Sequence, residues 1–79
     1  MRITGHVTRL VPGELGGPDR IFMEPDRHVD LRYVDGKHRA ASGEIIVEGA
    51  LEGRKVGEPI ELELSREADP LQTTLTVVR

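Results

Sequence analysis

The chain has 79 residues with no cysteine and no tryptophan, and its only aromatic side chains are one tyrosine and one phenylalanine. Without cysteine there is no disulfide framework, no thiolate-ligated zinc or iron–sulfur site and no thiol nucleophile. No apolar run approaches the roughly 18 residues that cross a bilayer, and the N-terminus lacks the apolar region of a secretory signal. We therefore expect a soluble cytoplasmic protein, or one within a virus particle assembled there, with no membrane partner.

Catalytic signatures are also missing. The two serines, Ser42 and Ser65, lie outside any Gly-x-Ser-x-Gly motif. His28 and Asp30 stand two apart on a predicted strand and could supply two zinc ligands, with His6 as a third. No His-x-x-x-His or Glu-x-x-His spacing supports such a site, so we interpret these side chains as an exposed face. The sequence predicts no enzyme: no catalytic residue, metal site, cofactor or small-molecule substrate.

Size and composition favour one small β domain spanning residues 1–79. A chain of 8.8 kDa can bury about 60% of its surface on folding, which is enough for one thin core. Valine, leucine and isoleucine supply 21 residues, and glycine and proline supply 14. Apolar residues alternate with polar ones in several stretches, and no window has helical periodicity. We predict an all-β fold: a small antiparallel β-barrel or two-sheet β-sandwich of six to seven short strands.

The first half of the chain contains three predicted strands. Residues 2–11 place Ile3, Val7 and Val11 on one face, and Gly5 on that face indicates a bulge or a close backbone crossing. The irregular loop 12–19 is followed by a short strand at 20–24. The clearest alternation covers 28–34, which places Val29, Leu31 and Tyr33 inward.

The second half begins with a predicted turn at Asp35-Gly36, a dipeptide typical of a two-residue hairpin. The returning strand would have its core side chains at even positions, whereas Ile45, Val47 and Leu51 are odd. We therefore predict a β-bulge near Gly43, or two strands broken there. Two more strands are expected at 60–64 and 71–78.

Acidic side chains line two of these strands. Glu44, Glu48 and Glu52 share an outward face that also contains Ile46, and Glu61 and Glu63 share another. Opposed glutamates on adjacent strands would destabilise a sheet. Three explanations are open: the strands are not neighbours, arginines from Arg2, Arg32 or Arg79 lie between them, or a basic partner covers the face.

The leading functional hypothesis is a non-enzymatic β-module that acts through protein–protein contacts, as a subunit or accessory component of a larger or self-associating assembly. A homo-oligomer or a virus-particle component fits this description. The alternative is an OB- or SH3-like nucleic-acid-binding domain that uses Arg20, Arg27, Arg32 and Arg39, which the acidic balance and scarce aromatics disfavour. The loop 12–19 ranks second as a contact surface, after the residues of first choice: His28, Asp30, Arg32, Glu44, Ile46 and Glu48.

Overall fold

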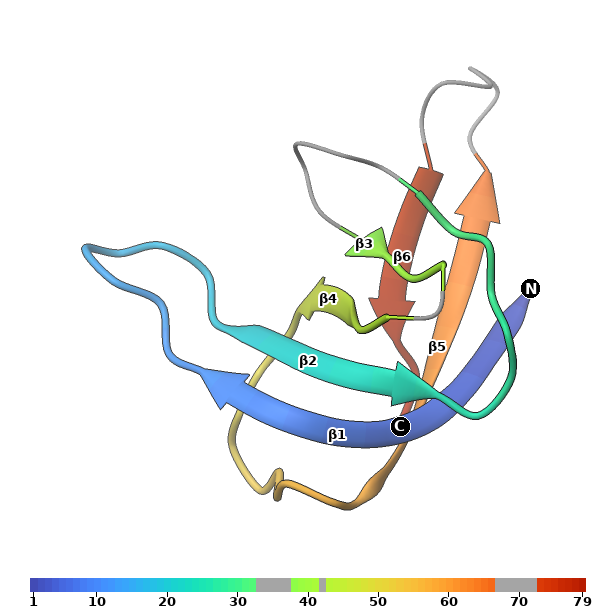
Figure 1. Cartoon of the computed structure of the whole chain (residues 1–79). Coiled ribbons are helices and arrows are strands. Elements are labelled where there is room, and N and C mark those ends of the chain that lie inside the picture. The colour runs from blue at the N-terminus through green and yellow to red at the C-terminus, as the bar shows by residue number, and fades with distance from the viewer. Residues whose placement is uncertain (33–37, 42, 67–72) are drawn as a thin grey trace.

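The computed structural model describes residues 1–32, 38–41, 43–66 and 73–79, and its strands form one antiparallel sheet rolled into a nearly closed barrel (Figure 1). The strand order is β3-β4-β2-β1-β5-β6, and β4 at one side of the sheet approaches β6 at the other. No helix long and apolar enough to cross a membrane occurs in the described ranges. The bounds are β1 Arg2–Val11, β2 Arg20–Pro25, β3 His38–Arg39, β4 Ile45–Glu48, β5 Pro59–Arg66 and β6 Thr73–Val77.

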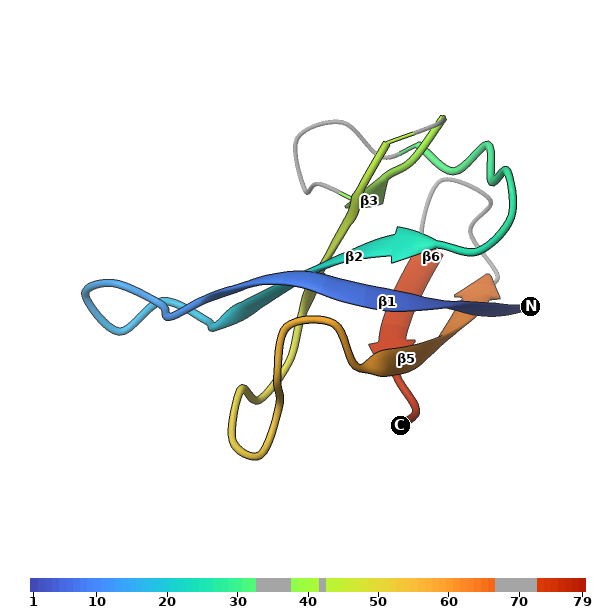
Figure 2. The same cartoon turned by 60° about the horizontal axis from the view of Figure 1, so that its bottom comes forward.

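The long strand β1 belongs to both halves of the barrel. Its residues 2–6 pair with β5, and its residues 5–11 pair with β2, so the strand curves across the molecule (Figures 1 and 2). Gly5 lies where the two pairings overlap. A Cβ there would overlap the carbonyl oxygen of Glu24 and lie 2.7 Å from Cε of Met23. The predicted close backbone crossing at Gly5 is thus confirmed.

A bulge in β1 reverses the orientation of its later side chains. Val7 pairs with Met23, but Arg9 pairs with Phe22, so Thr8 is an extra residue in the strand. Inward positions are odd before the bulge and even after it. Leu10 therefore packs against the core. The prediction that Val11 continues the inward face was wrong because the bulge shifts the parity by one residue.

The core fills the space inside the curled sheet. The side chains of Ile21, Met23, Ile45 and Leu62 have no exposed surface. The alternation predicted for 60–64 is confirmed, with Ile60 and Leu62 buried and Leu64 packed against them. The other buried members of the cluster are Ile3, Val7, Leu31, Ala40, Val47 and Leu75.

The strand predicted at 28–34 is the main error in the expected fold. Residues 28–32 join no ladder, although Val29 and Leu31 do point to the core as expected. The backbone N–H of Ala41 donates to the carbonyl oxygen of Val29 at 2.8 Å. Alternation reports which side chains are buried, not whether the backbone finds a strand partner. The predicted turn at Asp35-Gly36 and the inward Tyr33 lie outside the described residues.

Near Gly43 the sequence left two possibilities, one bulged strand or two separate strands. The structure has two separate strands, β3 and β4. β3 pairs with β4, and positive φ angles occur at Arg39, which ends β3, and at the next residues Ala40 and Ala41. Ile45 and Val47 are buried at the odd positions that the sequence indicated. The described sheet thus contains five strands of four or more residues and the two-residue β3, and it forms a barrel-like sheet rather than two packed layers.

Candidate contact groove

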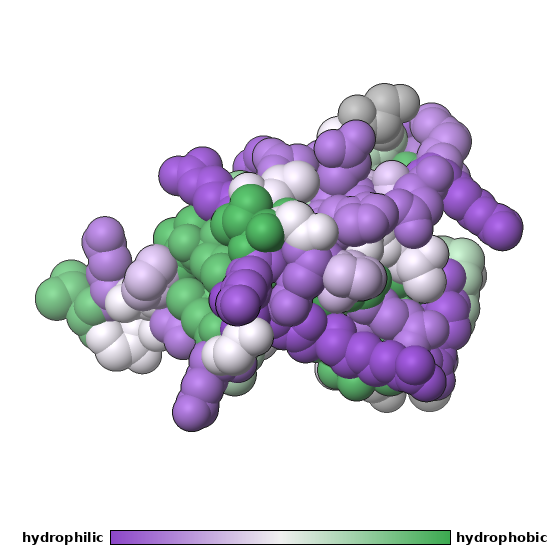
Figure 3. Space-filling view, turned by 90° about the horizontal axis from the view of Figure 1, so that it is seen from below, coloured by the Kyte–Doolittle hydropathy of each residue, from purple (hydrophilic) through white to green (hydrophobic). Residues whose placement is uncertain are grey.

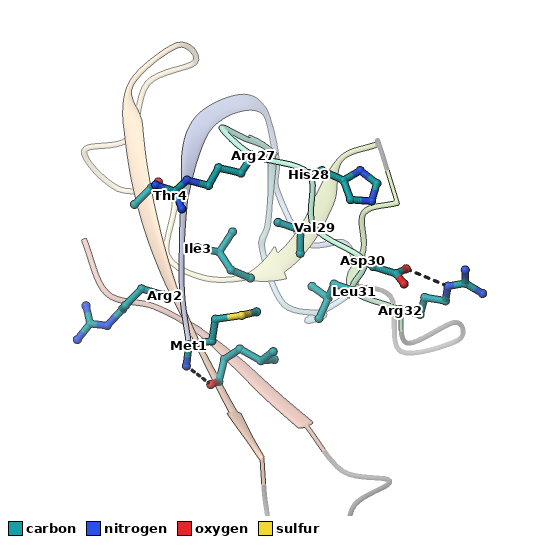
Figure 4. Close-up of a pocket in the computed structure, with 11 residues that line it drawn as sticks. Met1, Arg2, Ile3, Thr4, Arg27, His28, Val29, Asp30, Leu31 and Arg32 are labelled. Atoms are coloured by element: carbon teal, nitrogen blue, oxygen red, sulfur yellow. Dashed lines mark hydrogen bonds and ion pairs between the residues drawn. The ribbon is translucent and has the colours of Figure 1, made fainter.

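A groove opens where the chain after β2 leaves β1. Pro25 lies opposite Gly5, and the last rung is the N–H of Asp26 donating to the carbonyl oxygen of Thr4 at 2.9 Å. Proline has no N–H to extend the ladder, which favours a strand end there. Residues 27–32 then diverge from the first residues of β1, and the space between the two segments is about 740 Å³ (Figure 4).

The floor of this groove is apolar. Figure 4 shows the side chains of Ile3, Val29 and Leu31 directed into the space between β1 and the 27–32 segment, and Leu64 of β5 also lines it. Ile3 and Leu31 are buried, at 4% and 7% exposure. A ligand would therefore meet the edge of the core itself rather than isolated surface methyl groups.

The rim carries positive charge. Arg27 is exposed, and Arg32 places its Nε 3.4 Å from Oδ1 of Asp30. Both partners of that ion pair are well exposed, so it contributes little to stability. Arg2 also lines the groove, but Glu61 and Glu63 hold its guanidinium group. The other charged side chains among the described lining residues are Arg27, Arg32 and Asp30, which together carry a net charge of +1.

Among the described residues, the edge of β1 that faces the groove has no backbone partner at Arg2. Odd-numbered residues of β1 bond to β5, as the two bonds between Met1 and Leu64 show. Even-numbered residues therefore direct their N–H and C=O groups the other way. Thr4 has Asp26 as a partner, but no bond is made by the backbone N–H or C=O of Arg2 to any described residue on that side. Arg2 thus presents a short open strand edge.

The structure brings together only half of the contact residues expected from the sequence. His28, Asp30 and Arg32 are exposed and lie together on the groove rim. Glu48 ends β4 and Glu44 directly precedes it, and both are exposed. In the sheet, β2 separates β4 from β1, so these two glutamates do not lie at the groove.

Ile46 was expected to be an exposed apolar residue between those glutamates, and this was wrong. It is 7% exposed, because it pairs with Phe22 on the outer face of the sheet, where Arg9 also packs. Glu44 accepts a hydrogen bond from Oγ1 of Thr8.

Pairing within the chain accounts for the acidic strands. β4 and β5 are not neighbours in the sheet. Arg2 places Nη1 3.2 Å from Oε2 of Glu61 and Nε 2.7 Å from Oε2 of Glu63, and Arg79 lies 3.6 Å from Glu61. The first two of the three explanations are therefore confirmed, with Arg2 and Arg79, not Arg32, as the intervening residues.

The four arginines of the nucleic-acid hypothesis do not converge on one site. Arg27 and Arg32 line the groove, whereas Arg20 lies on β2 opposite Glu48 and Arg39 on β3 opposite Ile45. The outer face of β1 and β2 instead pairs Arg9 with an aromatic ring: its Cζ lies 5.2 Å from the centroid of Phe22, a cation–π distance.

The loop 12–19 projects from the barrel as the connection between β1 and β2 (Figure 1). Leu15 at its turn is completely exposed and has a positive φ of 52°. Figure 3 shows apolar atoms at this projecting tip and a second apolar area beside it. The loop is held by the N–H of Gly13, which donates to Oδ1 of Asp19 at 2.8 Å.

The zinc ligands considered from the sequence are also separated. Nδ1 of His6 lies 3.2 Å from Oδ1 of Asp26, whereas His28 and Asp30 lie on the groove rim. Within the described ranges no group of three His, Asp or Glu side chains is placed to hold a metal ion.

Sequence reasoning missed Arg27, Ile3 and Leu64 as groove residues. Pro25, four residues before Val29, was the available signal that the 28–34 alternation does not continue a strand of the sheet. No protein-family model, curated protein or solved structure matches this chain.

Proposed function

We propose that this protein is a non-enzymatic binding module that works through protein–protein contact, as one component of a larger assembly. The groove between β1 and residues 27–32 receives an extended segment of the partner protein. The observation that carries the proposal is the open backbone edge at Arg2 beside an apolar floor. Those two features together are what strand addition requires: main-chain bonds supply affinity, and pockets for alternate side chains supply specificity.

A selection from a random peptide library displayed on phage, with the full chain immobilised, tests this function. We expect enriched peptides that adopt extended conformations and perturb the NMR methyl signals of Ile3, Val29 and Leu31. The matched control signal is the methyl resonance of Leu15, which lies on the projecting loop. Enrichment of peptides that perturb only signals outside the groove, or no enrichment, overturns the proposal.

Single-stranded nucleic acid is the second candidate ligand, and the strand order favours it. Without the two-residue β3, the strands lie in the order β4-β2-β1-β5-β6, and β4 approaches β6. Numbered along the chain, these five strands are the third, second, first, fourth and fifth. This is the order of OB-type barrels, which bind oligonucleotides on the faces of their second and third strands. The analogy is one of fold only.

The outer face offers Phe22 for base stacking, with Arg9 and Arg20 beside it. Glu24 and Glu48 on the same face offset the charge of the two arginines, which is why protein contact ranks first. A labelled 20-nucleotide oligo(dT), titrated with the protein at low salt, tests this candidate. Binding that weakens steeply with salt and with Phe22→Ala would support it, and no binding would remove it.

A further inference from the structure

The strand β5 already shows which chemistry the first residues of β1 accept. Along β5, Leu62 and Leu64 face the core, and Glu61 and Glu63, which alternate with them, form ion pairs with Arg2. Apolar side chains fill the inner face, and carboxylates meet a guanidinium group on the outer face. Alternating apolar and acidic residues are therefore the pattern that pairs with this part of β1 inside the folded chain.

The opposite edge of β1 presents matching groups without such a strand. Its apolar floor is Ile3, Val29 and Leu31 (Figure 4). Among the described residues, Arg27 forms no ion pair, and Arg32 has one ion-pair partner, the exposed carboxylate of Asp30 at 3.4 Å. Arg27, Arg32 and Asp30 together carry +1 in a chain of −3, so the charge of the described rim is opposite to that of the protein as a whole.

We propose that the groove binds an extended acidic peptide segment in which apolar side chains alternate with Asp or Glu. The inference rests on the proposed function and specifies the class of partner. The apolar side chains of the peptide contact Ile3 and Leu31, its carboxylates contact Arg27 and Arg32, and its backbone bonds to the open edge at Arg2. Basic segments are rejected because their positively charged side chains would lie close to the like charges of Arg27 and Arg32.

Three end-blocked, fluorescein-labelled peptides test this specificity against the full chain at 50 mM NaCl, with fluorescence anisotropy as the measurement. The first is Ser-Glu-Leu-Glu-Ile-Glu-Val-Glu-Ser, and the other two replace every Glu by Gln or by Lys. We expect the Glu peptide to bind about tenfold more tightly than the Gln peptide, and the Lys peptide to show no saturable binding. For the Glu peptide, affinity falls as the salt concentration rises.

Charge-reversal variants locate the binding. The double variant Arg27→Glu/Arg32→Glu should weaken binding of the Glu peptide about tenfold or more, because two attractive contacts become repulsive. Lys55→Glu makes one such charge reversal, half the change of the double variant, at an exposed loop position that does not line the groove, and it should change the affinity less than about twofold. Circular dichroism checks that both variants are folded. If a variant does not fold, the salt dependence of Glu-peptide binding to the unaltered protein still tests the electrostatic contribution.

Hydrogen exchange separates strand addition from nonspecific charge attraction. Bound Glu peptide should slow exchange of the Arg2 amide, which a purely electrostatic association would leave unchanged. Equal affinity for the Glu and Gln peptides, tighter binding of the Lys peptide, or an unaffected Arg2 amide would overturn the inference. In those cases groove-directed peptides from the phage selection would leave the proposed function standing. If that selection also yields no groove-directed peptide, both fail.

Discussion

Gly5 of β1 faces the carbonyl group of Glu24 in β2 so closely that a methyl group at Gly5 would overlap the carbonyl oxygen and lie 2.9 Å from the carbonyl carbon. Both partners are backbone, so neither can move without breaking the sheet. We expect Gly5→Ala to lower the free energy of unfolding by about 3 kcal/mol, measured by urea denaturation.

The matched control for this change is Gly43→Ala. Its added methyl group would lie 3.3 Å from the carbonyl oxygen of Ala40 on an exposed turn. We expect a loss below about 1 kcal/mol. Equal losses for the two variants would contradict the close backbone crossing at Gly5.

Ile46 on the outer face is expected to contribute to stability like a core residue. It is 7% exposed and lies opposite Phe22, so Ile46→Ala removes buried methyl groups. The expected loss is about 2–4 kcal/mol, whereas Glu48→Ala, at an exposed side chain two residues further on the same outer face, should change stability by less than about 0.5 kcal/mol. Thermal unfolding followed by circular dichroism measures both, and a neutral Ile46→Ala would show that this side chain is not packed.

Replacement of Leu62 and of Leu15 by alanine should have very different effects on the free energy of unfolding. Leu62 is completely buried, and Leu15 is completely exposed on the projecting loop. Leu62→Ala should therefore lower the free energy of unfolding by about 2–5 kcal/mol, and Leu15→Ala should change it by less than about 0.5 kcal/mol. The same urea experiment compares them. A large loss for Leu15→Ala would mean that the loop packs against something in solution.

The ion pair between Arg2 and Glu63 should contribute only modestly. The guanidinium and carboxylate lie 2.7 Å apart, but their side chains are 55% and 36% exposed. A double-mutant cycle with Arg2→Met and Glu63→Gln should give a coupling energy of about 0.3–1 kcal/mol, which declines in 1 M NaCl because salt screens exposed charges. A coupling energy that is unaffected by salt would indicate a desolvated pair instead.

The open edge of β1 can be tested in the unliganded protein. By the alternation of the antiparallel ladder, the amide of Ile3 is bonded to Leu62, whereas the amide of Arg2 faces the groove. Hydrogen exchange followed by NMR should show the Arg2 amide exchanging at least about tenfold faster than that of Ile3. Equal protection would mean that the groove edge is already occupied, for example by a second copy of the chain.

Local patterning predicted the buried set well and the hydrogen-bond partners less well. Ile60 and Leu62 alternate with Glu61 and Glu63, and burial follows that alternation because a two-residue period assigns each side chain to one face. Val29 and Leu31 obey the same rule and point to the core, yet their segment forms no ladder. Side-chain burial is decided residue by residue, whereas strand pairing also needs a partner edge within reach.

The contact residues illustrate the same limit. His28, Asp30 and Arg32 were predicted to be exposed together and do line one rim. Ile46 was assigned to the exposed face by parity, but Phe22 and Arg9 pack on that face. A residue on the outer side of a sheet is buried if its neighbours on adjacent strands are large, and the sequence of one strand does not name those neighbours.

By itself the sequence determined the all-β class, the single thin core and the absence of thiol chemistry, because these depend on composition and on the two-residue period of a strand. Tertiary structure alone decided that Thr8 forms a bulge, that β1 joins both halves of the barrel, and that the chain after Pro25 leaves the sheet. Each of these depends on which strand edges meet in space. Arg2 therefore lines one groove with Arg27 and Leu31, although it is far from both of them in the chain.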